Sequence, residues 1–248
     1  MKLHWTLGIL ILGLSLQGAF YYVSPEGNDK FPGTSPDKPL KSLKQALYKA
    51  RSGDTVMVKG GIYREELWRE WRTGNQKPIT VKAFPDETPV ITFGWSVKNW
   101  KKLPGGLWAS DFPYAVCDLW QRLTLDRYLR VDSMELLQKQ PGAFFQDPRS
   151  GKLYVNPFNG SWHDDPEKAG FTAIPYGTGR TPLPFDDTKA TRFRRSGLSV
   201  VGNNLVFEGL SFEFHGASGF SIRGRKMDNF YGSVRLRNCS AIGTTLGF

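Results

Sequence analysis

Residues 21–67 read YYVSPEGNDKFPGTSPDKPLKSLKQALYKARSGDTVMVKGGIYREEL, and the order of elements in this stretch decides the expected fold. An apolar strand at 20–23 precedes a loop at 24–39 that is rich in turn-forming Gly, Asn, Asp and Pro. An apolar stripe of helical period then predicts a helix from Leu40 to Arg51. The residues of the stripe are Leu40, Leu43, Ala46, Leu47 and Ala50. After a Ser-Gly-Asp turn, the largely β-branched run 55–58 predicts a second strand.

The predicted helix needs a surface that its apolar stripe can cover. Stacked parallel strands leave an apolar core open at each end of a β-solenoid, and a terminal element with a polar outer face is required there for solubility. The polar face of this helix carries Lys41, Lys44 and Lys49. The sequence therefore predicts a helix that caps a β-solenoid, followed by strands with no further helices.

Two runs in this region, 22–47 (YVSPEGNDKFPGTSPDKPLKSLKQAL) and 52–65 (SGDTVMVKGGIYRE), resemble a known family. They are similar to the N-terminal cap and first coil of secreted right-handed parallel β-helix proteins of the pectate-lyase-like superfamily. The resemblance implies an all-β solenoid with an N-terminal capping helix, export from the cell and action on carbohydrate. In that family a small β subdomain is inserted between the first coils and the main helix, and the run GKLYV at 151–155 stands in that place here.

The strand pattern divides the mature sequence into three segments. Residues 20–94 are the predicted cap and first coils. Residues 95–190 break the coil period and predict an inserted β-rich subdomain with its connection, including hairpins at 119–132 and 142–156. Residues 191–248 return to the coil pattern.

Two coils of this last segment can be aligned with each other. The run from Leu205 to Phe212 matches the run from Val234 to Ala241, with apolar residues alternating in both. The sequence stops at Phe248 in the middle of a coil, which would leave an open apolar end. We therefore expect a β-helix that is truncated at its C-terminus, a fragment of a longer product.

Residues 1–19 have the features of a secretory signal peptide. Lys2 precedes an apolar run at 7–16, which is too short for a membrane span, and Ala19 is the expected cleavage position. This pattern predicts a secreted or periplasmic/extracellular protein with no stable membrane span after cleavage. An uncleaved membrane anchor is the alternative.

Composition and charge narrow the class of partner. The chain has 248 residues, 40% of them apolar, and a formal net charge of +10. An exported basic protein meets anionic polysaccharide more readily than nucleic acid, so we expect a polysaccharide partner and a monomeric chain. The alternative is that the charge only keeps the protein soluble.

The two cysteines, Cys117 and Cys239, are too few for a disulfide scaffold. They are either paired with each other or two buried thiols.

Two classes of function stay open. The first is a carbohydrate-active enzyme, either a polysaccharide lyase or a glycoside hydrolase acting on an extended, acidic polysaccharide. The second is a non-catalytic carbohydrate-binding or cell-surface module of the same fold. A lyase needs a cation beside the uronate carboxylate and a base for the C5 proton, whereas a hydrolase needs two facing carboxylates. The candidate catalytic residues are Glu208, Glu213 and His215, which lie on or near a predicted coil corner.

The sequence also offers candidate residues for binding a metal ion and the substrate. A lyase would call for calcium, but the acidic pairs at 164–165 and 186–187 lie in predicted loops without metal-ligand spacing. Arg235 and Arg237 are the candidate substrate-binding residues, because strand alternation turns them outward if their neighbours point into the core. Four tryptophans form either a sugar-stacking platform or part of the core. They are Trp95, Trp100, Trp108 and Trp120.

Overall fold

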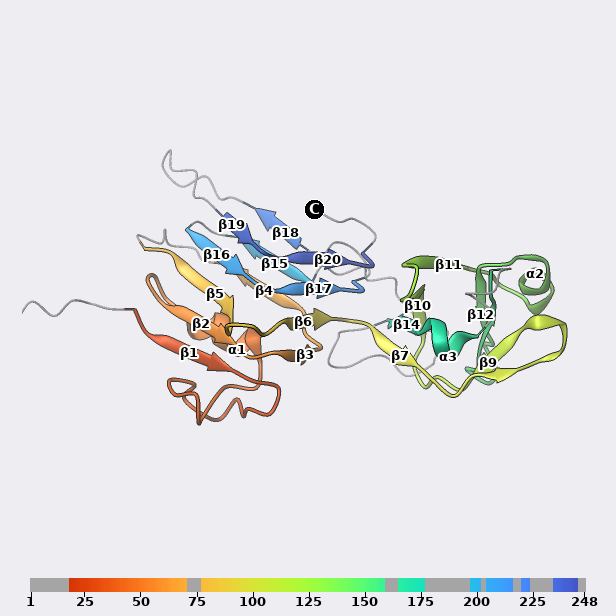
Figure 1. The fold of residues 1–248 in the computed structure, drawn as a ribbon, viewed down its shortest axis with the longest axis horizontal. Coiled ribbons are helices and arrows are strands. Elements are labelled where there is room, and N and C mark those ends of the chain that lie inside the picture. The colour runs from red at the N-terminus through yellow and green to blue at the C-terminus, as the bar shows by residue number, and fades with distance from the viewer. Residues whose placement is uncertain are drawn as a thin grey trace, which may run out of the picture.

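The computed structural model describes most of the chain and shows two β-rich parts side by side (Figure 1). The described residues are 18–70, 77–158, 165–176, 197–201, 204–215, 220–223 and 234–244. Parallel strands from the two ends of the sequence stack in one part, and a mixed sheet from the middle of the sequence forms the other. Most of the predicted signal peptide and residues 177–190 of the predicted insertion lie outside the described residues.

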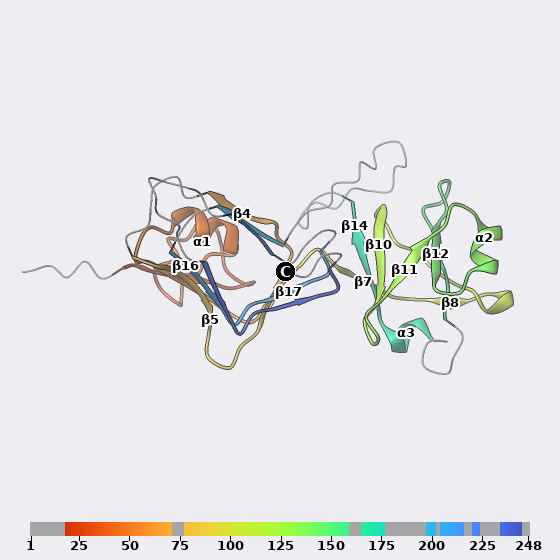
Figure 2. The same cartoon turned by 90° about the horizontal axis from the view of Figure 1, so that it is seen from above.

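Parallel strands form three sheets that surround a common interior (Figure 2). The five-stranded sheet has the order β1 (Phe20–Val23), β2 (Thr55–Val58), β5 (Ile79–Ala83), β16 (Leu205–Glu208), β19 (Val234–Arg237). The four-stranded sheet has the order β20 (Ser240–Ile242), β17 (Ser211–Glu213), β6 (Pro89–Thr92), β3 (Gly61–Tyr63). The three-stranded sheet has the order β18 (Phe220–Arg223), β15 (Leu198–Val201), β4 (Leu67–Glu70).

Apolar side chains of successive strands stack on one another inside these sheets. Val56, Val81, Phe207 and Leu236 are register partners on four neighbouring strands. The first three are buried in the main core, and Leu236 is partly buried against it. Leu205 lies beside Val234 in the structure, so the predicted alignment of the last two coils is the observed register. The alternating apolar pattern is therefore what turns one row of each strand inward.

The capping helix is present but shorter than predicted. Helix α1 spans Leu43–Lys49, whereas the apolar stripe predicted a helix from Leu40 to Arg51. Leu40 instead forms an isolated parallel bridge with Val23 of β1, which takes its backbone groups out of the helix. The Ser42 side chain accepts a hydrogen bond from the backbone N–H of Gln45 and caps the new start.

A distant carboxylate also holds the start of α1. The two oxygens of Glu65 accept hydrogen bonds from the backbone N–H groups of Leu43 (3.1 Å) and Lys44 (3.0 Å). Glu65 is 4% exposed and belongs to the segment between β3 and β4. The helix therefore packs its apolar face on the coil core while the coil satisfies its first donors.

The central part of the chain folds into an eight-stranded sheet. Its order is β7 (Trp95–Val97), β14 (Phe171–Pro175), β10 (Val116–Gln121), β11 (Asp126–Arg130), β12 (Ala143–Gln146), β13 (Leu153–Asn156), β9 (Trp108–Ser110), β8 (Lys101–Lys102). Only the β11–β12 pair is parallel in this sheet, so the pairing is mixed. The predicted hairpins are observed as β10–β11 and β12–β13. Parallel coils therefore do not run through the whole chain.

Short helices in the central part correct the expectation that no helix follows the cap. Helix α2 spans Met134–Lys139, helix α3 spans Pro166–Ala169, and a 3-10 turn spans Pro104–Gly106. Ser133 and Asp165 cap the two α-helices with their side chains. These helices lack a long apolar stripe, and their side-chain caps are the sequence signal for them. Within the described ranges, no helix is long and apolar enough to cross a membrane.

A small apolar cluster joins the two parts of the chain. Phe93 and Phe214 from the end of the coils and Ile174 from the mixed sheet are buried together, with Trp120 packed against them. The Trp120 and Phe214 rings meet edge to face with centroids 6.4 Å apart. Residues from both parts contribute to this contact, so it fixes where the mixed sheet lies relative to the coil surface.

His215 fills the coil interior beside this cluster. It is 0% exposed, its ring meets the Phe93 ring edge to face at 4.7 Å, and its Nε2 lies 3.0 Å from the carbonyl oxygen of Ile91. A Cβ on Gly197 would come within 2.5 Å of Nε2, so Gly197 leaves the space that the ring occupies. Burial lowers the pKa of His215 to about 4, because the charged imidazolium would lose its hydration there.

The contact between α1 and the coils can be tested with Leu43→Ala. Leu43 is 0% exposed, so we expect the free energy of unfolding to fall by about 2–5 kcal/mol. Lys44→Ala changes the exposed neighbour on the same helix and should stay within about 0.5 kcal/mol of the wild-type value. Equal urea-unfolding curves for the two variants would contradict the capping role of the helix.

Burial of neutral His215 predicts a pH dependence of stability. The unfolded chain binds a proton at this residue near pH 6.5, whereas the folded chain stays neutral until the pH approaches 4. The contribution of neutral His215 to the free energy of unfolding is therefore complete above pH 6.5. It is lost as the pH falls toward 4, by up to about 3 kcal/mol. In urea unfolding at pH 7.5, 6.0 and 5.0, His215→Gln should lose less stability than the wild type. Parallel pH profiles would contradict this prediction, because they would show that His215 has the same pKa in the folded and the unfolded chain.

Candidate functional site

The predicted substrate-binding arginines lie on the outer face of the five-stranded sheet. Arg235 and Arg237 are exposed, while Val234 and Leu236, which alternate with them along β19, are partly buried against the core. The outward orientation expected from strand alternation is thus observed. This orientation does not test whether the two arginines bind substrate, so their binding role stays a prediction.

Glu208 lies in the same outward row as two cations. It is the register partner of Lys82 on β5 and of Arg237 on β19. Neighbouring strands in a sheet are about 4.8 Å apart, so the row offers alternating positive, negative and positive groups at close spacing. A polymer that carries both hydroxyl and carboxylate groups finds donors and acceptors along such a row.

Glu213 lies on a different sheet and is held at the junction of the two parts. Its carboxylate accepts a hydrogen bond from the Ser211 hydroxyl at 3.2 Å and lies 3.3 Å from Nη2 of Arg122, which follows β10. The Arg122 guanidinium carbon is also 4.9 Å from the centroid of the Phe214 ring. Glu213 therefore has a structural partner in the mixed sheet, which sequence reasoning did not reveal.

The three candidate catalytic residues are not gathered into one site. The chain bends at Gly209 (φ 72°), so Glu208 and Glu213 belong to different sheets. His215 is enclosed in the core, where it contacts Phe93 and cannot reach a ligand at the coil surface. The candidate residues therefore contribute an outward charged row on the coils and a salt bridge at the junction, and the three of them form no facing pair of acid and base.

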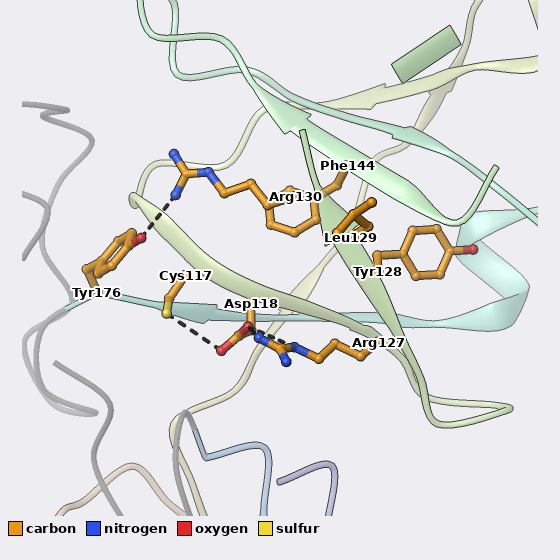
Figure 3. Close-up of a pocket in the computed structure, with 8 residues that line it drawn as sticks. All are labelled: Cys117, Asp118, Arg127, Tyr128, Leu129, Arg130, Phe144 and Tyr176. Carbon is orange, nitrogen blue, oxygen red and sulfur yellow. Dashed lines mark hydrogen bonds and ion pairs between the residues drawn. The ribbon is translucent and has the colours of Figure 1, made fainter. Parts of the chain in front are cut away.

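A cavity of about 320 Å³ opens on the mixed sheet and was not foreseen (Figure 3). Arg130 donates hydrogen bonds from Nη1 to the Tyr176 hydroxyl at 3.0 Å and to the Val116 carbonyl oxygen at 3.2 Å. Arg127 donates to Oδ1 of Asp118, with its Nε at 2.9 Å. Strand pairing brings these groups together from β10, β11 and the end of β14.

A second hollow of about 420 Å³ lies beside the cap. The Arg64 guanidinium carbon lies 4.5 Å from the centroid of the Trp95 ring, and burial lowers the pKa of Arg64. Lys41 and Glu65 also line this hollow. Since Glu65 already accepts two backbone hydrogen bonds from α1, the hollow is closely tied to the cap structure.

The tryptophans belong to the core of the mixed sheet and its junction. Trp100 is 7% exposed, and Trp95 and Trp108 pack against the same apolar cluster. Trp120 packs at the junction instead. The core interpretation is therefore the observed one, and the four rings are spread over two clusters.

Metal ligands and a disulfide are also absent from the described part of the chain. None of its residues form a group of three or more His, Cys, Asp or Glu side chains that could hold a metal ion. Asp165 caps α3, whereas Asp164 and the pair 186–187 lie outside the described residues. Cys117 and Cys239 are not joined in a disulfide.

Two solved structures share the fold of this chain. A structure of XylC in complex with xylose matches 82% of this chain and 41% of its own chain, with a TM-score of 0.51 and 16% identity. A structure described as a glycoside hydrolase matches 79% of this chain and 50% of its own, also with a TM-score of 0.51 and 16% identity. The chain thus corresponds to half or less of each of these structures.

Sequence comparison gives one local similarity. A stretch of 82 residues, 33% of this chain, is 42% identical to the uncharacterized protein YwoF of Bacillus subtilis (strain 168) and corresponds to 17% of that protein. No protein-family model matches the chain. The comparisons therefore show a fold that this chain shares with parts of two longer proteins.

Proposed function

We propose that this chain is part of an exported right-handed parallel β-helix protein that binds an extended, acidic polysaccharide along the outer face of its coils. The fold part of the proposal is supported by three sheets of in-register parallel strands and by the likeness to two longer structures. One of those structures holds xylose and the other is described as a glycoside hydrolase, which favours carbohydrate as the ligand class. The proposed export signal is residues 1–19, and the proposed state is a monomer.

The outward row on the five-stranded sheet is the observation that carries this proposal. Lys82, Glu208 and Arg237 are register partners, and Arg235 lies two residues before Arg237 on the same exposed face. Each coil adds one strand to the row, so the spacing repeats at about 4.8 Å. A rigid surface with repeated charges fits a polymer better than a small metabolite. The net charge of +10 favours a polyanion over a neutral glucan.

Enzyme and binding module remain the two forms of this proposal. The described residues favour binding, because Glu213 is paired with Arg122 and His215 is buried, which leaves neither as an available acid or base. For the whole protein we propose polysaccharide lyase or glycoside hydrolase activity on the same polymer, on the strength of the fold likeness alone.

The proposed role of the coil surface in binding a polyanion can be tested by removing the charges of Arg235 and Arg237. Arg235→Ala/Arg237→Ala should weaken binding to polygalacturonate by about 2- to 30-fold, since each exposed pair is worth a few tenths to one kcal/mol. Binding should also weaken between about 0.05 M and 0.5 M salt, because screening shortens the reach of surface charges. Affinity electrophoresis or titration calorimetry of the full chain measures both effects.

Lys101→Ala/Lys102→Ala is the matched control, because these two lysines are exposed on β8 of the mixed sheet and carry the same total charge. This variant should bind polygalacturonate about as well as the wild type. Equal binding of polygalacturonate and a neutral glucan, unaffected by salt and by the arginine substitutions, would disprove the coil surface as a polyanion site.

A further inference from the structure

The cavity on the mixed sheet combines charged, hydroxyl and apolar groups within one small space. Figure 3 shows Arg130 and Tyr176 pointing toward each other on one side, with Asp118 and Arg127 paired on another. Leu129, which is 56% exposed, adds an apolar side chain to the lining of the cavity. The volume of about 320 Å³ is at the small end of the range for small-molecule sites, so the cavity suits a single sugar unit.

A β-bulge opens the strand that forms the floor of this cavity. Val116 pairs with Pro175 and Asp118 pairs with Ile174, so Cys117 is an extra residue in β10. Bulges redirect the side chains of the strand that carries them and occur beside binding sites. Here the bulge leaves the Val116 carbonyl oxygen available to accept from Arg130.

The two arginines of β11 differ in their counter-charges. Arg127 donates to Asp118, whose side chain is only 5% exposed, so that pair is neutral overall. Arg130 donates to a backbone carbonyl and to a tyrosine hydroxyl, both of which are uncharged. Among the described residues, no carboxylate lies within 4.0 Å of Arg130. Both of these hydrogen bonds use Nη1, so within the described part of the chain the Nε and Nη2 donors of the guanidinium stay available to a ligand.

We propose that this cavity is a subsite for the carboxylate of a uronic acid, a proposal that rests on the polysaccharide function above and names its substrate class. The planar guanidinium of Arg130 matches a carboxylate through two parallel N–H···O bonds. The Tyr176 hydroxyl accepts from Arg130 and so keeps its own hydrogen for a sugar oxygen. The Asp118–Arg127 pair offers an acceptor and donors to ring hydroxyls, while Leu129 covers an apolar face of the ring.

Charge also gives this cavity its selectivity. Arg130 is partly buried, so a neutral sugar would remove water from the guanidinium without supplying a counter-charge. A uronate supplies that charge and restores the lost hydrogen bonds. We therefore expect D-galacturonate to bind more tightly than D-galactose, which has the same ring hydroxyls but carries a neutral hydroxymethyl group in place of the carboxylate.

The test is a titration of the full chain with monomeric D-galacturonate, followed by NMR or calorimetry. Arg130→Gln removes the charge and should weaken galacturonate binding by about 10- to 100-fold, the range for charge-assisted hydrogen bonds. Arg130→Lys keeps the charge but lacks the paired N–H donors of the guanidinium, so it should give an intermediate loss of galacturonate affinity. Arg149→Gln, on an exposed turn of the same part, is the matched control and should leave the affinity unchanged.

A purely structural role for Arg130 gives a different result. The residue ties β11 to the bulge and to Tyr176, so Arg130→Gln can lower the stability of the sheet. Tyr176→Phe keeps the arginine and removes one hydroxyl, and it should still weaken galacturonate binding by about 2- to 10-fold. Unchanged galacturonate affinity in folded Arg130→Gln and Tyr176→Phe would overturn the proposal. Equal binding of galacturonate, galactose and acetate would overturn it as well.

The monomer experiment separates this subsite from the coil surface. Arg235→Ala/Arg237→Ala should bind monomeric galacturonate as the wild type does, because those arginines lie on the other part of the chain. If polygalacturonate binds but the monomer does not, the subsite is disproved and the coil function stands. If the monomer binds through Arg130 but the coil variant binds polygalacturonate normally, the subsite stands and the coil function fails.

Discussion

The stacking of inward side chains in register is the constraint on which the structure depends. Val81 pairs with Val56 on one side and Phe207 on the other, and Phe207 pairs with Leu236. A shift by one residue would exchange the inward row with the outward row on every strand that it affects. The core and the outer charged row are therefore set by the same register, and neither can change alone.

The long central segment is accommodated because it leaves and rejoins the coils at one corner. β6 ends at Thr92 and β15 begins at Leu198, and both belong to the parallel sheets. Between them, the mixed sheet makes its own core and returns Ile174 and Trp120 to the coil residues Phe93 and Phe214. The coils thus continue past the mixed sheet without loss of register, since β16 pairs directly with β5.

Local periodicity explains which features the sequence could predict. The coil alignment, the hairpins and the outward arginines follow from alternation and turn residues, and all are observed. The start of α1 was misplaced because Leu40 fits the helical stripe equally well, yet its backbone bonds to β1. The cavity was not predictable, because Arg130 and Tyr176 are 46 positions apart and meet only through the pairing of β10 with both of their strands.

The junction between the mixed sheet and the coils has a consequence for affinity. Phe214 packs against Trp120, and Glu213 bonds to Arg122, so the two parts are held together by apolar and charged contacts at once. If the cavity and the coil row both bind the polymer as we propose, their fixed separation makes them a bivalent receptor, in which the second contact forms at a high effective concentration. Avidity would then give long polysaccharide chains a higher affinity than either proposed site has for a single sugar.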